Sequence, residues 1–257
     1  MARERGRQLL PSSRSLVIDI LHYARLVPSQ PLVRRCNLRP LAAAREAAAR
    51  KISWPVIFLR AYSLLATRTP ELRQTYMPWP WPHIYQHPQT VCMMAVERQY
   101  MGHERLFFGL YRTPEERSLA QLQQRLEVFK DQPVDQVQEF KWQRCLAACP
   151  WPLRRLVWWL ALNVSGVVRV RHLGTFGVTT VGSLGAISIH APTIQTTMLS
   201  FGPIDTDGHV RVTIVYDHRI LDGALVARYL ADLEQILCGQ MVAEVQAARP
   251  EERWGDV

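Results

Sequence analysis

The most informative stretch of the chain is Tyr216-Asp217-His218-Arg219-Ile220-Leu221-Asp222-Gly223. It holds a histidine and an aspartate four positions apart, and a glycine closes it. A turn at the edge of a rigid element exposes an imidazole and lets neighbouring groups fix its tautomer. Because imidazole titrates near neutral pH, His218 is a candidate general base that takes a proton from a thiol, hydroxyl or amine and later returns it.

The segments on either side of this motif have clear periodicity. Residues 210–216 are rich in β-branched side chains, which predicts a buried or half-buried strand. After Gly223 the apolar residues recur at helical spacing, which predicts an amphipathic helix: Val226, Tyr229, Leu230, Leu233 and Leu237. The motif alone leaves a second interpretation open, because a histidine in this pattern also occurs at structural positions and by chance.

The motif and the helix after it resemble the signature of the dihydrolipoamide acyltransferases, the core subunits of 2-oxo acid dehydrogenase complexes. Chloramphenicol acetyltransferases share that fold and the H-x-x-x-D-G core. Residues 173–185 are similar to the family's G-T-F-T-I-S-N-L-G segment, and residues 52–61, leading to 69–72, resemble its helix with the P-x-L-N end. Residues 13–15 resemble the start of the family's first helix, so the match runs in order from residue 12 to 240.

This resemblance implies an α+β fold of the chloramphenicol acetyltransferase type, with a mixed central sheet, flanking helices and a homotrimeric assembly. It implies that His218 is the base of a direct acyl transfer at a subunit interface. Thr179 matches the hydroxyl that stabilises the oxyanion, although Gly177 replaces the family's preceding threonine and Thr180 is an alternative donor. Loss of such a donor costs about 10²–10³ in kcat in other enzymes.

The other implied roles are structural. Asp222 matches an aspartate that pairs with an arginine near the start of the domain, and Arg14 is the best match for that arginine. We expect this pair to be buried and to orient the histidine loop. Gly182 and Gly185 are expected to let the backbone turn tightly near the site, and Gly223 marks the entry to the helix after the motif.

The sequence divides into a flexible N-terminus (1–11), a catalytic domain (12–240) and a C-terminal tail (241–257). No lipoylation turn is recognisable, and the only lysines are Lys51, Lys130 and Lys141. We therefore expect a free-standing catalytic domain without lipoyl attachment. An Asp-Gly hairpin signal at 205–208 replaces a longer family loop, which disfavours a large cubic or dodecahedral core.

Charge and cysteines limit the partners. The 257 residues carry a net charge of +9, almost all from arginine. This excess is either an ordinary basic surface or an attraction for acyl-coenzyme A, an acidic acyl carrier protein or an anionic membrane. Scattered arginines and no recognisable motif disfavour nucleic acid. Five cysteines show no metal spacing, and Cys145 and Cys149, four apart, are expected to be buried thiols in a reducing cytoplasm.

The segment 150–162 is apolar but contains Arg154 and Arg155, and it is too short to span a bilayer. Three interpretations remain open. It is a core or trimer-contact helix, an interfacial helix that touches the inner face of the membrane through Trp158 and Trp159, or the wall of a long-chain acyl site. Two further functions compete with the acyltransferase: a non-catalytic trimeric scaffold and a membrane-associated lipid acyltransferase.

The periodicity predicts the remaining elements. Strands are expected at 33–38, and as a pair at 91–97 and 106–111. The segment 77–85 is expected to be irregular because it is rich in proline. Helices are expected at 16–26, 41–51, 54–67 and 114–130, the last with Glu115 and Glu116 in its first turn.

Overall fold

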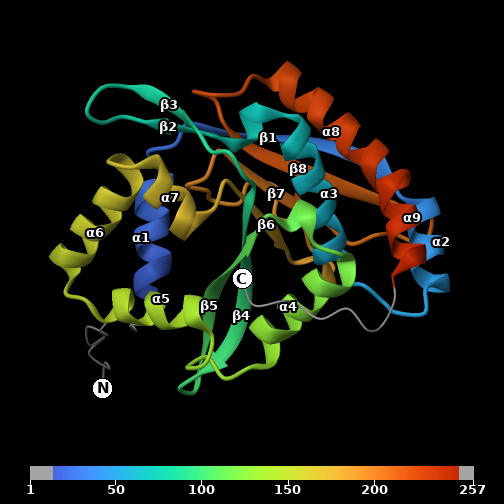
Figure 1. Cartoon of the computed structure of the whole chain (residues 1–257), viewed down its shortest axis with the longest axis horizontal. Coiled ribbons are helices and arrows are strands. Elements are labelled where there is room, and N and C mark those ends of the chain that lie inside the picture. The colour runs from blue at the N-terminus through green and yellow to red at the C-terminus, as the bar shows by residue number, and fades with distance from the viewer. Residues whose placement is uncertain (1–13, 249–257) are drawn as a thin grey trace, which may run out of the picture.

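The computed structural model describes residues 14–248. At its centre lies a six-stranded mixed sheet with the order β1-β8-β7-β6-β4-β5 (Figure 1). The pairs β7–β6 and β6–β4 are parallel, and the other neighbouring pairs are antiparallel. The strands are β1 (Ser29–Asn37), β4 (Val91–Tyr100), β5 (His103–Arg112), β6 (Phe176–Thr180), β7 (Thr197–Phe201) and β8 (His209–Asp217).

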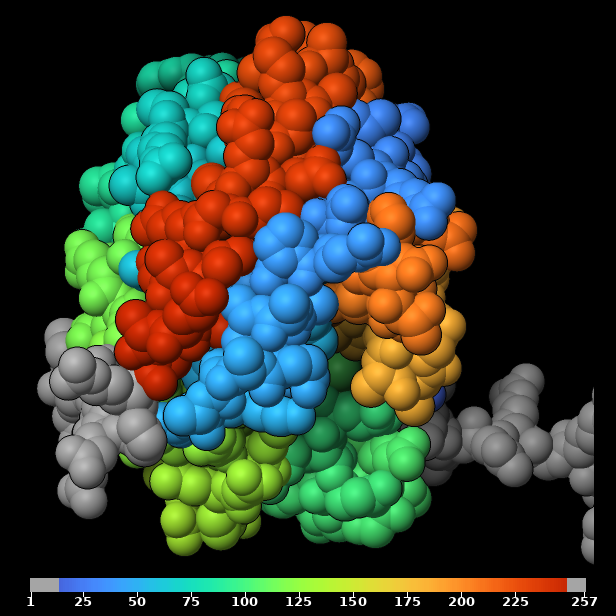
Figure 2. All heavy atoms as spheres, turned by 90° about the vertical axis from the view of Figure 1, so that its right-hand side faces the viewer, coloured from blue at the N-terminus to red at the C-terminus, as the bar shows by residue number. Residues whose placement is uncertain are grey.

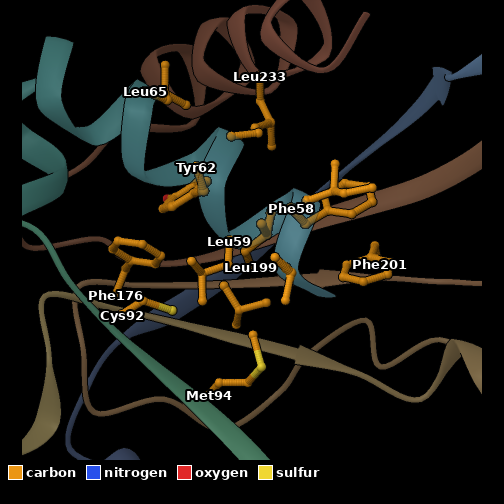
Figure 3. Close-up of a cluster of buried hydrophobic side chains, with 14 of the residues drawn as sticks. Phe58, Leu59, Tyr62, Leu65, Cys92, Met94, Phe176, Leu199, Phe201 and Leu233 are labelled. Carbon is orange, nitrogen blue, oxygen red and sulfur yellow. The ribbon is translucent and has the colours of Figure 1, made fainter. Parts of the chain in front are cut away.

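The main core lies between one face of this sheet and a helical layer. The layer consists of α2 (Arg39–Ala47), α3 (Trp54–Arg68), α4 (Leu119–Asp131), α8 (Gly223–Cys238) and α9 (Gln240–Ala247). Figure 3 shows side chains of α3 pointing at the sheet: Phe58 stacks on Phe201 with ring centroids 4.0 Å apart, and Tyr62 packs against Phe176. The core therefore holds β6, β7 and β8 in register against α3 and α8.

A second group of helices packs beside the other strands: α1 (Ser15–Ala24), α5 (Gln138–Ala148), α6 (Trp151–Asn163) and α7 (Gly166–Leu173). They lie together on the left of Figure 1. Helix α5 runs along the edge strand β5, where the Gln143 amide binds both the N–H (3.0 Å) and the C=O (2.7 Å) of Phe108. This covers an edge that would otherwise present unpaired backbone groups.

Helix α9 extends the domain beyond the predicted boundary at residue 240. It packs against α2 and α8, and its Met241 and Val245 side chains are fully buried. Figure 2 shows α9 beside α2 on this face of the molecule. Residues 241–247 thus belong to the folded domain and are not a tail. The predicted flexible segment 1–11 and residues 249–257 lie outside the described residues.

Two other local predictions are corrected. The segment 77–85 is only partly irregular, because its ends belong to the antiparallel hairpin of β2 (Gln74–Met77) and β3 (His83–Gln86). The helix predicted from residue 114 begins instead at Leu119, after a short 3-10 turn (Pro114–Glu116). The reason is a capping box: the Ser118 hydroxyl accepts from the Gln121 N–H, and the Gln121 side chain accepts from the Ser118 N–H.

The other predicted elements are confirmed within a few residues at their ends. These are the helices near 16–26, 41–51 and 54–67, the strand at 33–38, the strand pair of β4 with β5, and the strand and helix on either side of the histidine motif. The Asp-Gly turn is also confirmed: the Gly208 N–H donates to Asp205 C=O at 3.0 Å, and Gly208 has a φ of +81°. Two short 3-10 turns complete the structure at Pro70–Arg73 and Gly182–Leu184.

Candidate active site

His218 follows directly after the last residue of β8, in a turn held at both ends. Its backbone N–H donates to the Pro28 C=O at 3.1 Å, which ties the turn to the segment between α1 and β1. The N–H groups of Ile220 and Leu221 both donate to the Asp217 C=O at 3.1 Å. The histidine therefore sits on a fixed backbone between the central sheet and the start of α8.

The imidazole of His218 is accessible and has one charged neighbour. Its side chain is 46% exposed, and Nδ1 lies 3.7 Å from Oδ1 of Asp222. The rings of His218 and Tyr216 are 5.5 Å apart. A carboxylate near Nδ1 favours the tautomer with the proton on that nitrogen, which leaves the Nε2 lone pair to accept a proton.

The buried ion pair of this loop is formed by Asp217 and Arg219. The Asp217 side chain is 2% exposed. It accepts hydrogen bonds from Arg219 Nε at 2.9 Å and from Arg219 Nη2 at 2.6 Å. The Arg219 guanidinium also lies over the Tyr76 ring, 4.3 Å from its centroid. The sequence predicts no role for this pair, because it forms across the turn after β8, where strand periodicity no longer applies.

The predicted buried pair of Arg14 and Asp222 is not found. Arg14 is exposed just before α1, and the Asp222 side chain is 87% exposed. The histidine turn contacts Pro28, beyond the other end of α1, and a helix of ten residues is about 15 Å long. Arg14 is therefore at the wrong end of its helix to reach Asp222.

Thr179 and Thr180 have different surroundings. Phe176 and Val178 point into the main core, so Thr179 faces the opposite side of β6 by strand alternation. Thr179 is half-buried, and its hydroxyl makes no hydrogen bond among the residues of the described chain. The Thr180 hydroxyl makes two hydrogen bonds: it donates to the Phe201 C=O (2.9 Å) and accepts from the Gly182 N–H (3.0 Å).

One chain does not bring Thr179 and His218 together. The N–H of Asp217 donates to Thr196 C=O, just before β7, whereas Thr179 pairs with Ser200 near the far end of β7. The two are therefore separated by about 13 Å along the strand direction and by about 10 Å across two strand spacings. The imidazole also lies beside the Tyr216 ring, which belongs to the main core, whereas Thr179 faces the other side of the sheet.

The glycines near the site have identifiable neighbours. A Cβ at Gly177 would lie 2.5 Å from Met198 Cε, so Met198 fills the space that a threonine would occupy there. A Cβ at Gly182 would lie 3.0 Å from the Gly202 C=O oxygen, so the two backbone segments approach closely there. A Cβ at Gly223 would lie 3.3 Å from the Tyr216 hydroxyl.

Helix α6 has one buried and one exposed apolar face. Trp158 and Leu162 are buried with residues of α1, α5 and α7 in a second core cluster. Arg154 and Arg155 both turn inward to Asp19, so neither serves as a headgroup contact. Trp158 likewise lies too deep for the predicted membrane contact. The exposed apolar side chains of α6 are Trp151, Leu153, Leu156, Trp159 and Leu160.

The thiols and possible metal ligands add little to the site. Cys36 and Cys92 are buried, but Cys145 is exposed and Cys149 is half-buried, which corrects the prediction that this pair is buried. The structure between residues 14 and 248 contains no group of three His, Cys, Asp or Glu placed to hold a metal. Within the same range, no helix combines the length and apolar character that crossing a bilayer requires.

The fold matches solved acyltransferase structures. A probable dihydrolipoamide acetyltransferase from Listeria monocytogenes 4b F2365 aligns with a TM-score of 0.65 at 15% identity, over 95% of this chain and 97% of that one. The Azotobacter vinelandii dihydrolipoamide acetyltransferase aligns with a TM-score of 0.63 at 17% identity, over 93% and 94%. Its study concerned the catalytic role of a serine, a histidine and an asparagine.

A chloramphenicol acetyltransferase aligns with a TM-score of 0.51 at 14% identity, over 90% of this chain and all of that one. No family model and no curated protein matches by sequence. The chain thus has the mixed-sheet α+β fold of acyltransferases. More specifically, it has the fold of dihydrolipoamide acetyltransferase catalytic domains and of chloramphenicol acetyltransferase, which confirms the predicted fold class.

Proposed function

We propose that this protein is an acyltransferase that uses His218 as a general base. Nε2 of His218 takes the proton of an acceptor thiol, amine or hydroxyl as that group attacks the carbonyl carbon of a thioester. The tetrahedral intermediate then collapses, the carbon–sulfur bond breaks, and the leaving thiolate takes the proton from the imidazolium. Such a base contributes about 10²–10⁴-fold to the rate.

The observation that carries this proposal is the combination of exposure and a neighbouring carboxylate at the His218 imidazole. Asp222 lies at Nδ1, the ring is nearly half exposed, and the turn is tied to β8 and Pro28. A histidine that serves only packing has no physical need for this exposure or for a carboxylate at one ring nitrogen. The scaffold alternative requires neither feature.

Thr179 is the proposed oxyanion donor, and it comes from a second copy of the chain. Its hydroxyl has no hydrogen-bond partner among residues 14–248, which suits a donor for developing negative charge, whereas the Thr180 hydroxyl already makes two hydrogen bonds. Since the two groups of one chain are far apart, a complete site needs His218 from one copy and Thr179 from another. A homotrimer with three such sites is the proposed assembly.

The residues studied in the Azotobacter vinelandii enzyme support the choice of His218, Asp222 and Thr179 as site residues. The histidine and asparagine named in its mechanistic study are four positions apart, as are His218 and Asp222 here, and a serine precedes them as Thr179 precedes His218. An aspartate in place of an asparagine puts a charge beside the imidazole. We propose that Asp222 orients the ring.

The proposed donor is a thioester of coenzyme A or of an acyl carrier protein. Net charge of +9, mostly from arginine, favours an anionic carrier of either kind. Peripheral contact with the inner face of a membrane is a further proposal, which now rests on Trp159 and the other exposed apolar side chains of α6 and no longer on Trp158.

The test is the turnover of His218→Ala with acetyl-coenzyme A and small nucleophiles, followed by mass spectrometry of the acylated product. We expect a loss of about 10²–10⁴-fold, with an unchanged oligomeric mass. His103→Ala, at the exposed first residue of β5, is the matched control and should keep full turnover. An unchanged rate in His218→Ala would refute the base, and a wild-type protein that transfers no acyl group would favour the scaffold.

A further inference from the structure

A small cavity lies directly beside the histidine turn. Its volume is about 50 Å³, and its walls include Val27 and Arg219. These two residues are the chain neighbours of Pro28 and His218, whose backbones are hydrogen-bonded to each other. One water needs roughly 10–15 Å³ of such space, so the cavity holds a group of a few heavy atoms but not a long acyl chain.

Arg219 presents unused donors at this cavity. Its Nε and Nη2 bind Asp217, and its guanidinium plane rests on the Tyr76 ring. Its Nη1 has no partner within residues 14–248, although the side chain is only 28% exposed. A guanidinium fixed on two sides keeps a planar edge of N–H groups in place, which suits a carboxylate.

Arg169 is the second guanidinium in the cavity wall, and it is buried. It donates to three backbone carbonyls, those of Tyr76 (2.9 Å), Leu162 (3.1 Å) and Ile194 (2.6 Å). No carboxylate of the described part of the chain forms an ion pair with it, and the C-terminal end of α6 at Leu162 supplies only part of a negative charge. Burial, and then the charge of Arg219, lower the pKa of Arg169 to about 10, while Asp217 opposes this.

The cavity wall therefore carries two guanidinium groups, and the described residues that line it include no carboxylate; Asp217, which binds Arg219, is not part of the wall. A buried charge is normally paired, and here the unmatched positive charge belongs to the wall of a half-open cavity beside the base. The rest of the wall is mostly apolar or aromatic: Tyr23, Leu26, Val27, Tyr76, Pro78, Leu162 and Ile194.

From this geometry we infer that the cavity binds a carboxylate group of the acceptor, so that the acceptor is a small carboxylic acid with a thiol, amine or hydroxyl on a short spacer. This inference rests on the proposed acyl transfer and specifies its substrate class. The spacer is short because consecutive Cα atoms are about 3.8 Å apart, and the cavity wall begins one residue from His218.

The first experiment compares matched acceptors with acetyl-coenzyme A as donor. Mercaptoacetate is compared with mercaptoethanol, and glycine with ethanolamine, with product measured by mass spectrometry. Since a hydrogen-bonded charge contributes about 1.5–3 kcal/mol, we expect kcat/KM for the acid of the accepted pair to exceed that for the alcohol about tenfold or more. Equal values for the acid and the alcohol would overturn the inference.

The second experiment changes the cavity mouth without touching either arginine. Leu26 lines the cavity and is 64% exposed, so polar replacements there should fold. Leu26→Glu places a negative charge at the mouth, and Leu26→Gln is its neutral match. We expect Leu26→Glu to remove the preference for the acid, and Leu26→Gln to keep it, with turnover of the alcohol similar in both variants. Equal preferences in both variants would contradict the site.

A third measurement separates this inference from the proposed function. Acetate should raise the unfolding temperature of the wild-type protein and of Leu26→Gln more than acetamide does, and this difference should vanish in Leu26→Glu. If acetate behaves in this way but no acceptor is acylated, the anion site stands and the acyltransferase proposal fails. If acyl transfer proceeds but acetate and acetamide act alike, the acyltransferase stands and the anion site fails.

Discussion

Thr179 and His218 lie beside opposite ends of the same strand, β7. Thr179 pairs with Ser200 on one side of that strand, and His218 follows Asp217, whose N–H binds Thr196 at its start. The two side chains also face different sides of the sheet. In the proposed mechanism each chain therefore contributes two half-sites, and this relationship links the proposed chemistry to the proposed assembly.

Replacement of the two adjacent threonines separates catalysis from stability. Thr179→Ala should lower kcat about 10²–10³-fold with little effect on unfolding, because its hydroxyl has no partner within the described chain. Thr180→Ala should lower the free energy of unfolding by about 1–3 kcal/mol, because it removes two hydrogen bonds. Steady-state kinetics and urea unfolding of both variants check this. Near-normal kcat in Thr179→Ala would move the oxyanion role to another group.

The two aspartates of the motif should differ in their effect on stability. Asp217→Ala leaves Arg219 without its buried partner, and breaking such a pair from one side costs about 3–5 kcal/mol. Asp222 is 87% exposed, so Asp222→Ala should leave the free energy of unfolding nearly unchanged and should lower kcat by misorienting the imidazole. Equal destabilisation by the two changes, in chemical denaturation, would contradict these assignments.

Gly177 and Met198 should behave as a coupled pair. Gly177→Thr places a Cβ within 2.6 Å of two atoms of Met198, and overpacking of this kind costs about 1–3 kcal/mol. Met198→Ala in the same chain removes the clash, so the double variant should be more stable than the sum of the single changes predicts, by about 0.5–3 kcal/mol. A double-mutant cycle measured by urea unfolding that shows additive effects would argue against this contact.

The adjacent tryptophans of α6 should also differ. Trp158 is buried in the second core cluster, and its replacement by alanine should cost about 3–5 kcal/mol. Trp159 is 41% exposed, so Trp159→Ala should change stability little. Thermal or chemical unfolding of both variants measures the difference. If Trp159→Ala destabilised the protein as much as Trp158→Ala, the orientation of α6 would be different.

The histidine turn, the strand before it and the helix after it could be predicted because the motif and its periodicities are local. The Asp-Gly hairpin was predictable for the same reason. Arg14 was misplaced because a match at the start of a helix does not show which end of that helix meets the loop. The capping box at Ser118 was readable in the sequence, but two preceding glutamates suggested an earlier helix start.

Other features depend on tertiary packing that the sequence does not reveal. In the sequence, Arg154 and Arg155 fit the polar positions of an interfacial helix. In the structure both turn inward, because both pair with Asp19 on α1. The pairing of Asp217 with Arg219 depends on the bend after β8, which places side chains two residues apart on one side. The separation of Thr179 from His218 follows from the strand order, which local patterns do not specify.

The most direct test of the account mixes two inactive chains. His218→Ala and Thr179→Ala are each purified, mixed in equal amounts, and reassembled after mild dissociation. If every site combines His218 of one copy with Thr179 of another, random assembly restores about a quarter of the wild-type activity. If the mixture stays as inactive as its two components while subunit exchange is verified by mass, the two residues do not form a site between chains.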